Sequence, residues 1–91
     1  MIEIKSMYHF QNLCKEKLVN WYNFRDNVKT FISVEDTFVV WACKTLQNYK
    51  ALLSTTVNGD GVYVEYTYNG DKHELYEDVY TKVQNTCHTE E

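Results

Sequence analysis

A strictly alternating segment in the second half of the 91-residue chain is the feature that most constrains the fold. In it, apolar Val62, Val64, Tyr66 and Tyr68 alternate with Tyr63, Glu65 and Thr67. Successive side chains of a β-strand point to opposite faces, so this pattern predicts a strand with one buried face. The preceding residues Asn58-Gly59-Asp60-Gly61 are a strong turn signal, because asparagine and glycine tolerate positive φ. The segment 50–57, before that turn, is therefore predicted as a neighbouring strand.

The apolar segment from Thr37 to about Thr45 is predicted as another strand, because its β-branched and aromatic side chains suit a pleated surface. Simple alternation puts apolar side chains on both faces of this strand. One face would carry Phe38, Val40 and Ala42, and the other would carry Val39, Trp41 and Cys43. Such a strand is either covered on both sides or forms a dimer contact, so the pattern favours a homodimer. The residues just before it, 33–36, are ambiguous. Ser33 and Asp36 match a capping box that could begin a helix, but a short turn fits better.

Two helices are predicted at the ends of the chain. Ser6 can cap the first helix. Its apolar positions recur at three- and four-residue steps from Met7 to Val28, and the helix is predicted to end within 27–30. Between the first two predicted strands, Leu46 to Tyr49 is predicted as a turn with Asn48 at its tip. Asp71 and Glu74 resemble a capping box before a second helix that runs to about Asn85.

The predicted fold is thus α+β, one domain over residues 1–91, in the order α-β-β-β-α. A three-stranded antiparallel meander packs against both helices, which cover one face. The ordered core is expected over about residues 5–86, with a flexible tail at 87–91.

Charge and cysteine content indicate the setting of the chain. Residues 1–56 hold 7 basic and 5 acidic side chains, whereas residues 57–91 hold 2 basic and 8 acidic ones. The acidic second half could face a basic partner surface. The three cysteines, Cys14, Cys43 and Cys87, show no tight spacing, and no signal peptide or membrane-length apolar run is visible. These features predict a cytoplasmic protein with Cys14 and Cys43 buried and inert.

The sequence argues against several activities. We expect no enzyme, no cofactor and no metal site, since no nucleotide-loop, nucleophile-elbow or paired metal-ligand motif occurs. His73 with Asp71 and Glu74 could form an acid/base cluster, although a solvated helix start explains them equally. Nucleic-acid binding is disfavoured because residues 71–78 carry acids where phosphate contacts need lysines.

The candidate binding residues lie around the first hairpin and on one sheet face. They are Lys44, Gln47, Asn48 and Lys50, together with Tyr63 and Glu65. If both helices cover one face, the other face exposes Tyr63 with Val39, Trp41 and Leu52, and exposed apolar surface usually marks a binding site. The alternative assignment of faces puts these residues in the core.

Two segments resemble a known family. Residues 39–55, VVWACKTLQNYKALLST, and residues 66–72, YTYNGDK, followed by Tyr76 and Val79-Tyr80, resemble small proteins of unknown function encoded by bacteriophages and prophages of low-GC Gram-positive bacteria. The resemblance covers roughly residues 8–87. It implies an accessory phage product in the host cytoplasm and carries over no site residues.

The sequence thus favours a protein without catalytic activity that binds a host protein. That partner would be a defence factor or a replication or transcription factor, which the chain modulates or inhibits. The alternative is a protein that sequesters a small nucleotide-type signalling molecule, with Lys44, Lys50 and Asn48 near aromatic rings holding phosphate and base. A nucleic-acid-associated module is the third reading. No membrane association is expected.

Overall fold

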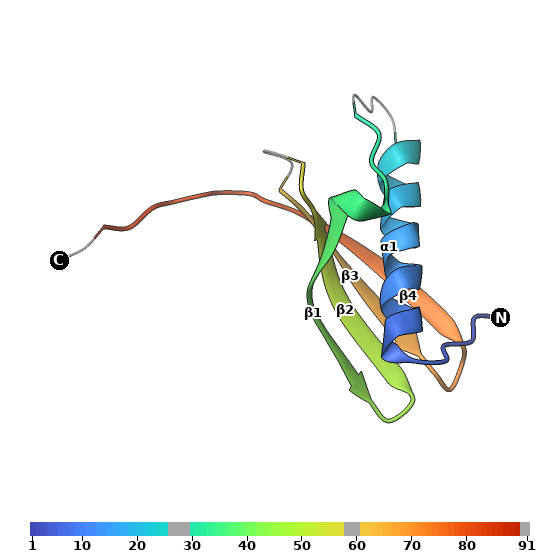
Figure 1. The fold of residues 1–91 in the computed structure, drawn as a ribbon. Coiled ribbons are helices and arrows are strands. Elements are labelled where there is room, and N and C mark those ends of the chain that lie inside the picture. Colours follow the sequence, from blue (N-terminus) through green and yellow to red (C-terminus); the bar gives the residue numbers. More distant parts are fainter. Residues whose placement is uncertain (26–29, 58–60, 90–91) are drawn as a thin grey trace.

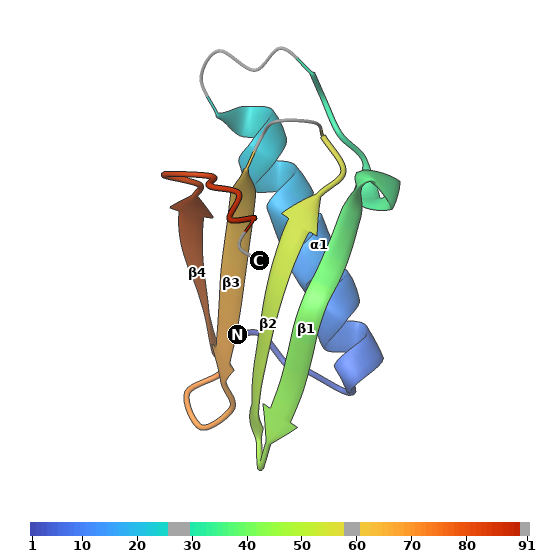
Figure 2. The same ribbon diagram turned by 90° about the vertical axis from the view of Figure 1, so that its left-hand side faces the viewer.

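The computed structural model describes residues 1–25, 30–57 and 61–89 of the chain. Within them lie a helix, α1 (Met7–Phe24), and a 3-10 turn, η1 (Val34–Asp36). Four strands follow, β1 (Thr37–Thr45), β2 (Asn48–Thr55), β3 (Val62–Asn69) and β4 (Glu74–Thr81). The strands form one antiparallel sheet in the order β1-β2-β3-β4. Helix α1 lies across one face of this sheet, and no helix of the described chain covers the other face (Figures 1 and 2).

The predicted α+β class is confirmed, but the element count is wrong. The described residues form one helix and four strands, not two helices and three strands. The predicted turn at 58–60 lies outside the described residues. The predicted end of the first helix within 27–30 is wrong, because the helix ends at Phe24 and Arg25 already has an extended backbone.

Helix α1 begins where its capping residue predicts. The Ser6 side-chain oxygen accepts a hydrogen bond from the His9 backbone N–H at 3.0 Å, which satisfies a donor that the first turn leaves unpaired. Four side chains at four-residue steps are buried on one stripe, and they are Phe10, Cys14, Leu18 and Tyr22. Because residues four apart share a helix face, this stripe packs directly on the sheet.

The core lies between that stripe and strands β2 and β3. Its sheet side consists of Tyr49, Ala51 and Leu53 from β2 and Val62, Val64, Tyr66 and Tyr68 from β3. The alternation that predicted β3 is therefore confirmed, with the even-numbered positions buried. The β1–β2 turn is shorter than expected. Asn48 already begins β2, and the turn consists of Leu46, at φ 55°, and Gln47.

Strand β1 contains a bulge that changes its faces. Val39 pairs with Leu53 and Trp41 pairs with Leu52, so Val40 is the extra residue. Residues directly opposite each other share a face, so Val39 turns toward the helix and Trp41 turns away from it. The face assignment by simple alternation, which put these two side chains together, is therefore wrong. The capping box of Ser33 and Asp36 is present, but it closes only the 3-10 turn η1 before the strand begins.

The segment predicted as the second helix is strand β4. Its positions 75, 77, 79 and 81 face the helix side, and Tyr76, Asp78 and Tyr80 face the other way. The predicted Asp71–Glu74 cap is replaced by a turn in which the Asn69 side-chain oxygen accepts from the N–H groups of Asp71 and Lys72, at 3.0 and 3.3 Å. An asparagine that bonds to the backbone in this way favours a turn over a helix start.

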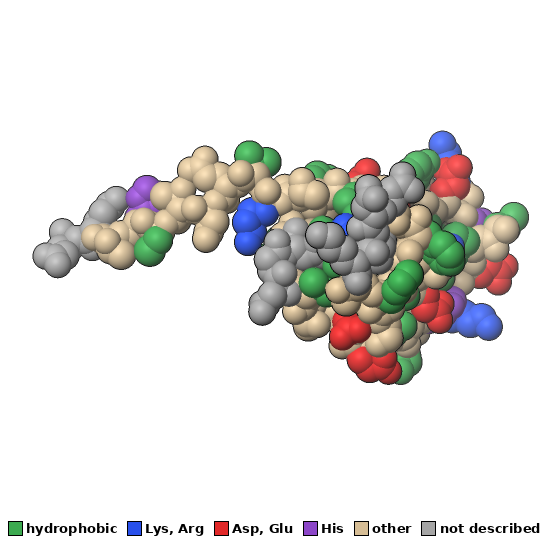
Figure 3. All heavy atoms as spheres, turned by 90° about the horizontal axis from the view of Figure 1, so that it is seen from above, with side chains coloured by type: hydrophobic (Ala, Val, Ile, Leu, Met, Phe, Trp, Pro, Cys, Tyr) green, Lys and Arg blue, Asp and Glu red, His purple; other side chains and the backbone are tan. Residues whose placement is uncertain are grey.

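The two ends of the chain behave differently. The N-terminal segment is tied down, since the Tyr68 hydroxyl donates to the Ile2 carbonyl oxygen at 2.6 Å and Ile2 and Ile4 pack against the core. The segment 82–89 has no regular secondary structure and is exposed throughout. It extends away from the body of the molecule, as Figure 3 shows.

Candidate functional site

The sheet face turned away from α1 is the main candidate site, and we call it the open face. Strand pairing places on it Phe38, Trp41 and Cys43 of β1, Lys50 and Leu52 of β2, Tyr63, Glu65 and Thr67 of β3, and Tyr76, Asp78 and Tyr80 of β4, with Asn48 and Glu74 at one end. Figure 2 looks directly onto these strands.

Aromatic side chains on the open face remain accessible although they lie in the sheet. Phe38 and Trp41 are each 42% exposed, and Tyr80 is 52% exposed. Phe38, Tyr63 and Tyr80 lie in one row across the sheet, because Ser54 pairs with both Phe38 and Tyr63, and Tyr63 pairs with Tyr80. Tyr63 and Tyr80 are direct neighbours in this row, whereas Ser54 lies between Phe38 and Tyr63. The aromatic groups therefore gather in one region of the open face.

Charged side chains lie beside these aromatic groups on the open face. In the next row across the sheet, Trp41 pairs with Leu52, and Leu52 pairs with Glu65. Glu65 in turn pairs with Asp78. The Lys50 ammonium lies 3.5 Å from a Glu65 carboxylate oxygen. Glu74, at the end of β4, accepts a hydrogen bond from the Tyr76 hydroxyl at 3.0 Å, which raises the pKa of Tyr76. One lysine against three carboxylates makes this face acidic on balance.

The predicted site residues divide between the two sides of the sheet. Lys50, Tyr63 and Glu65 lie on the open face, and Asn48 and Lys50 line a hollow of about 180 Å³ there. Lys44 pairs with Tyr49 and lies on the helix side, with its ammonium 5.6 Å from the centre of the Tyr49 ring. Lys44 and Lys50 therefore lie on opposite sides of the sheet and line different hollows.

Gln47 and Asn48 have structural partners that the sequence did not reveal. The Asn48 side-chain oxygen accepts from the Gly70 backbone N–H at 2.9 Å, and the Gln47 side-chain amide donates to an Asp71 carboxylate oxygen. These bonds fasten the β1–β2 turn to the β3–β4 turn. Gln47 and Asn48 thus hold the two hairpin ends together.

Sequence reasoning missed Phe38, Tyr76 and Tyr80 as members of the open face. Phe38 was assigned to the wrong side because nothing local marks the bulge at Val40. Tyr76 and Tyr80 were read as helical, although the alternation of Tyr76, Asp78 and Tyr80 with Leu75 and Val79 was the signal for a strand.

The acid/base cluster suggested by the sequence is not assembled. His73 Nδ1 lies 3.0 Å from the Tyr68 hydroxyl and 3.2 Å from the Ile2 carbonyl oxygen. Asp71 instead bonds to Gln47, and Glu74 bonds to Tyr76. The three side chains thus have separate partners.

The cysteines differ from one another in environment. Cys14 is fully buried, and burial raises the pKa of its thiol to about 12, with a smaller contribution from the charge of Glu77. Cys43 was expected to be buried but is exposed, because the bulge in β1 turns it onto the open face. Among the described residues, no group of three or more histidine, cysteine or acidic side chains is placed to hold a metal ion.

Comparison with known proteins adds the family of the chain. A model described as a family of unknown function, DUF6275, matches residues 11–90. The chain belongs to the DUF6275 family. No curated protein and no solved structure matches it. Within the part of the chain that the structure describes, no helix is long and apolar enough to cross a membrane.

Proposed function

We propose that this DUF6275 protein is a small binding protein without catalytic activity that docks one partner protein on its open face. The observation that carries the proposal is the group of exposed aromatic side chains, Phe38, Trp41, Tyr63 and Tyr80, on a sheet face that no described helix covers. Exposed apolar patches of this kind mark interaction sites, and aromatic groups dominate the energy of protein interfaces.

The charge of the open face specifies the chemistry of the partner. The patch is bordered by Glu65, Asp78 and Glu74 and by a single lysine, Lys50. A protein with an apolar centre and basic side chains around it would complement this arrangement. The same acids disfavour a nucleic-acid backbone, which would need a basic surface beside the aromatic rings.

A second copy of the chain is the alternative occupant. Two copies packed through the open face would bring an acidic balance against an acidic balance, which opposes association. We therefore favour a different protein, and the homodimer becomes an outcome that light scattering distinguishes. A particle of twice the chain mass of 10.8 kDa, lost on Trp41→Glu, would establish the homodimer.

The resemblance of residues 39–55 and 66–72 to phage and prophage proteins supports a host protein as the partner. On this proposal the chain acts in the cytoplasm of a low-GC Gram-positive host. There it modulates or inhibits a defence factor or a replication or transcription factor.

Affinity capture from host lysate tests the proposal with a matched pair of variants. Trp41→Glu places a charge in the centre of the patch. Tyr8→Glu makes the same kind of change at an aromatic residue that is 75% exposed on α1. Wild type and Tyr8→Glu should retain one specific protein that Trp41→Glu loses, with circular dichroism confirming that both variants fold. Equal capture by the two variants would refute the assignment of the open face.

A further inference from the structure

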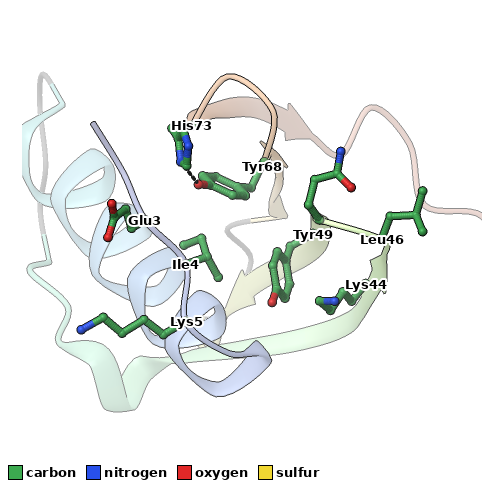
Figure 4. Close-up of a pocket in the computed structure, with 10 residues that line it drawn as sticks. Glu3, Ile4, Lys5, Lys44, Leu46, Tyr49, Tyr68 and His73 are labelled. Atoms are coloured by element: carbon green, nitrogen blue, oxygen red, sulfur yellow. Dashed lines mark hydrogen bonds between the residues drawn. The ribbon is translucent and has the colours of Figure 1, made fainter.

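A cavity of about 470 Å³ lies on the helix side of the sheet, apart from the open face. Its walls are the N-terminal segment before α1, the end of the β1–β2 hairpin and the β3–β4 turn (Figure 4). Three segments distant in sequence thus meet around one space. Its volume falls within the range of pockets that hold small molecules.

The three walls are held in place by bonds already described. The Tyr68 hydroxyl joins the N-terminal segment to His73, and the dashed line in Figure 4 marks its contact with the imidazole at 3.0 Å. Asn48 and Gln47 join the two hairpin ends. The cavity is therefore a feature of the folded chain before any ligand binds.

One cation, Lys44, is held at the wall of this cavity, although the whole chain has a formal net charge of −4. On the opposite wall, Figure 4 shows the Glu3 and Lys5 side chains directed away from Tyr49 and Lys44, and Ile4 directed toward them. The Lys44 ammonium lies over the Tyr49 ring, 5.6 Å from the centre, which keeps it at the cavity wall. A negatively charged group in this space would therefore meet the Lys44 ammonium.

Tyr49 supplies a polar group that the fold leaves available. Its side chain is only 7% exposed and lines the cavity. No hydrogen bond joins its hydroxyl to any residue in the described part of the chain, whereas the neighbouring Tyr68 hydroxyl is bonded to Ile2. The hydroxyl oxygen is not itself buried, so it is accessible to a ligand that enters the cavity.

We propose that this cavity binds a phosphorylated small molecule of mononucleotide size. The Lys44 ammonium faces its phosphate, and the Tyr49 hydroxyl donates a hydrogen bond to it. Ile4, Leu46 and the Tyr49 ring form the apolar wall against its organic part. This site uses neither Lys50 nor the open face, so it is independent of partner docking.

Isothermal titration of the full chain tests this proposal, with AMP, adenosine and inorganic phosphate as separate probes. AMP should bind in the millimolar range or tighter. Adenosine should bind about tenfold more weakly, since it lacks the charge-assisted bond to Lys44. Inorganic phosphate should also bind more weakly, since it lacks the apolar contact. Absence of binding by AMP, or equal affinity for adenosine, would overturn the proposal.

Variants locate the binding. Lys44→Gln and Tyr49→Phe should each weaken AMP binding several-fold, while Lys17→Gln, the same charge change at an exposed position of α1, should leave it unchanged. Chemical-shift changes on adding AMP to labelled protein should fall on Lys44 and Tyr49. An equal loss in Lys17→Gln, or shifts confined to the open face, would show that the cavity is not the site.

Discussion

Lys44 and Lys50 belong to one hairpin but lie on opposite faces of the sheet. Lys44 pairs with Tyr49 on the helix side, and Lys50 pairs with Cys43 on the open face. Lys44 lines the cavity, whereas Lys50 forms an ion pair with Glu65. Because successive side chains of a strand point to opposite faces of the sheet, the two ammonium groups belong to different binding surfaces.

This separation predicts that the two lysines affect different ligands. Lys44→Gln should weaken AMP binding and leave partner capture unchanged. Lys50→Glu should alter the salt dependence and rate of partner binding and leave AMP binding unchanged, because rim charges act mainly on association. Titration and surface-immobilised binding kinetics measure the two effects. A single variant that impaired both ligands equally would mean that the surfaces are not independent.

The contact between Gly70 and Gln47 predicts a strict requirement for glycine. A Cβ atom at position 70 would collide with the Gln47 carbonyl oxygen, so one hairpin end would have to move. We expect Gly70→Ala to lower the free energy of unfolding by about 1–3 kcal/mol, as overpacking does. Urea denaturation measures this, with Gln47→Ala as the comparison, since it removes only an exposed hydrogen bond. A loss for Gly70→Ala no larger than that for Gln47→Ala would contradict the described contact.

The cysteine environments predict selective alkylation. Cys43 and Cys87 are exposed, whereas Cys14 is buried beneath α1 with a raised thiol pKa. Because the thiolate is the reactive form, iodoacetamide should modify Cys43 and Cys87 in the native protein and Cys14 only in denaturant. Mass spectrometry of digested protein measures each site. Rapid native modification of Cys14 would show that α1 does not cover it.

The same thiol predicts a loss of stability at high pH. The folded state raises the Cys14 pKa from 9.0 to about 12, so between these values the unfolded chain loses a proton that the folded chain keeps. The free energy of unfolding should then fall as pH rises above 9, by up to about 1.4 kcal/mol per pH unit from this group. Burial also raises the pKa of Tyr66, which adds to the loss above pH 10.

Denaturant midpoints between pH 8 and 11 measure this effect. Cys14→Ala should show a shallower decline than wild type, while Cys87→Ala, which removes an exposed thiol, should follow the wild-type slope. Identical slopes for all three proteins would refute the contribution of Cys14.

Local sequence signals predicted the parts of the fold whose periodicity has one interpretation. The Ser6 cap, the stripe through Phe10 and Cys14, and the alternation in β3 each fit only one type of element. Strand β4 was misassigned because Leu75, Tyr76, Val79 and Tyr80 satisfy helical spacing as well as alternation. Pairing with β3, a tertiary interaction, decides between the two.

The candidate sites were less predictable because both depend on contacts between distant segments. The open face required the bulge at Val40, which no glycine marks. The cavity required the N-terminal segment to pack beside the hairpin ends, and the Tyr68–Ile2 bond that holds it there spans 66 positions in the chain. Lys44 was identified as a candidate from the sequence, but the side of the sheet on which it lies was not.

The most direct test of docking on the open face is the alkylation rate of Cys43 within the complex with the captured partner. Cys43 lies on the open face, whereas Cys87 lies in the exposed segment 82–89, which extends from the same side of the sheet (Figures 1 and 2), so the free protein is the reference. We predict that the partner slows iodoacetamide modification of Cys43 strongly relative to the free protein. Modification of Cys43 at the same rate in the free and bound protein would contradict the assignment of the open face as the docking surface.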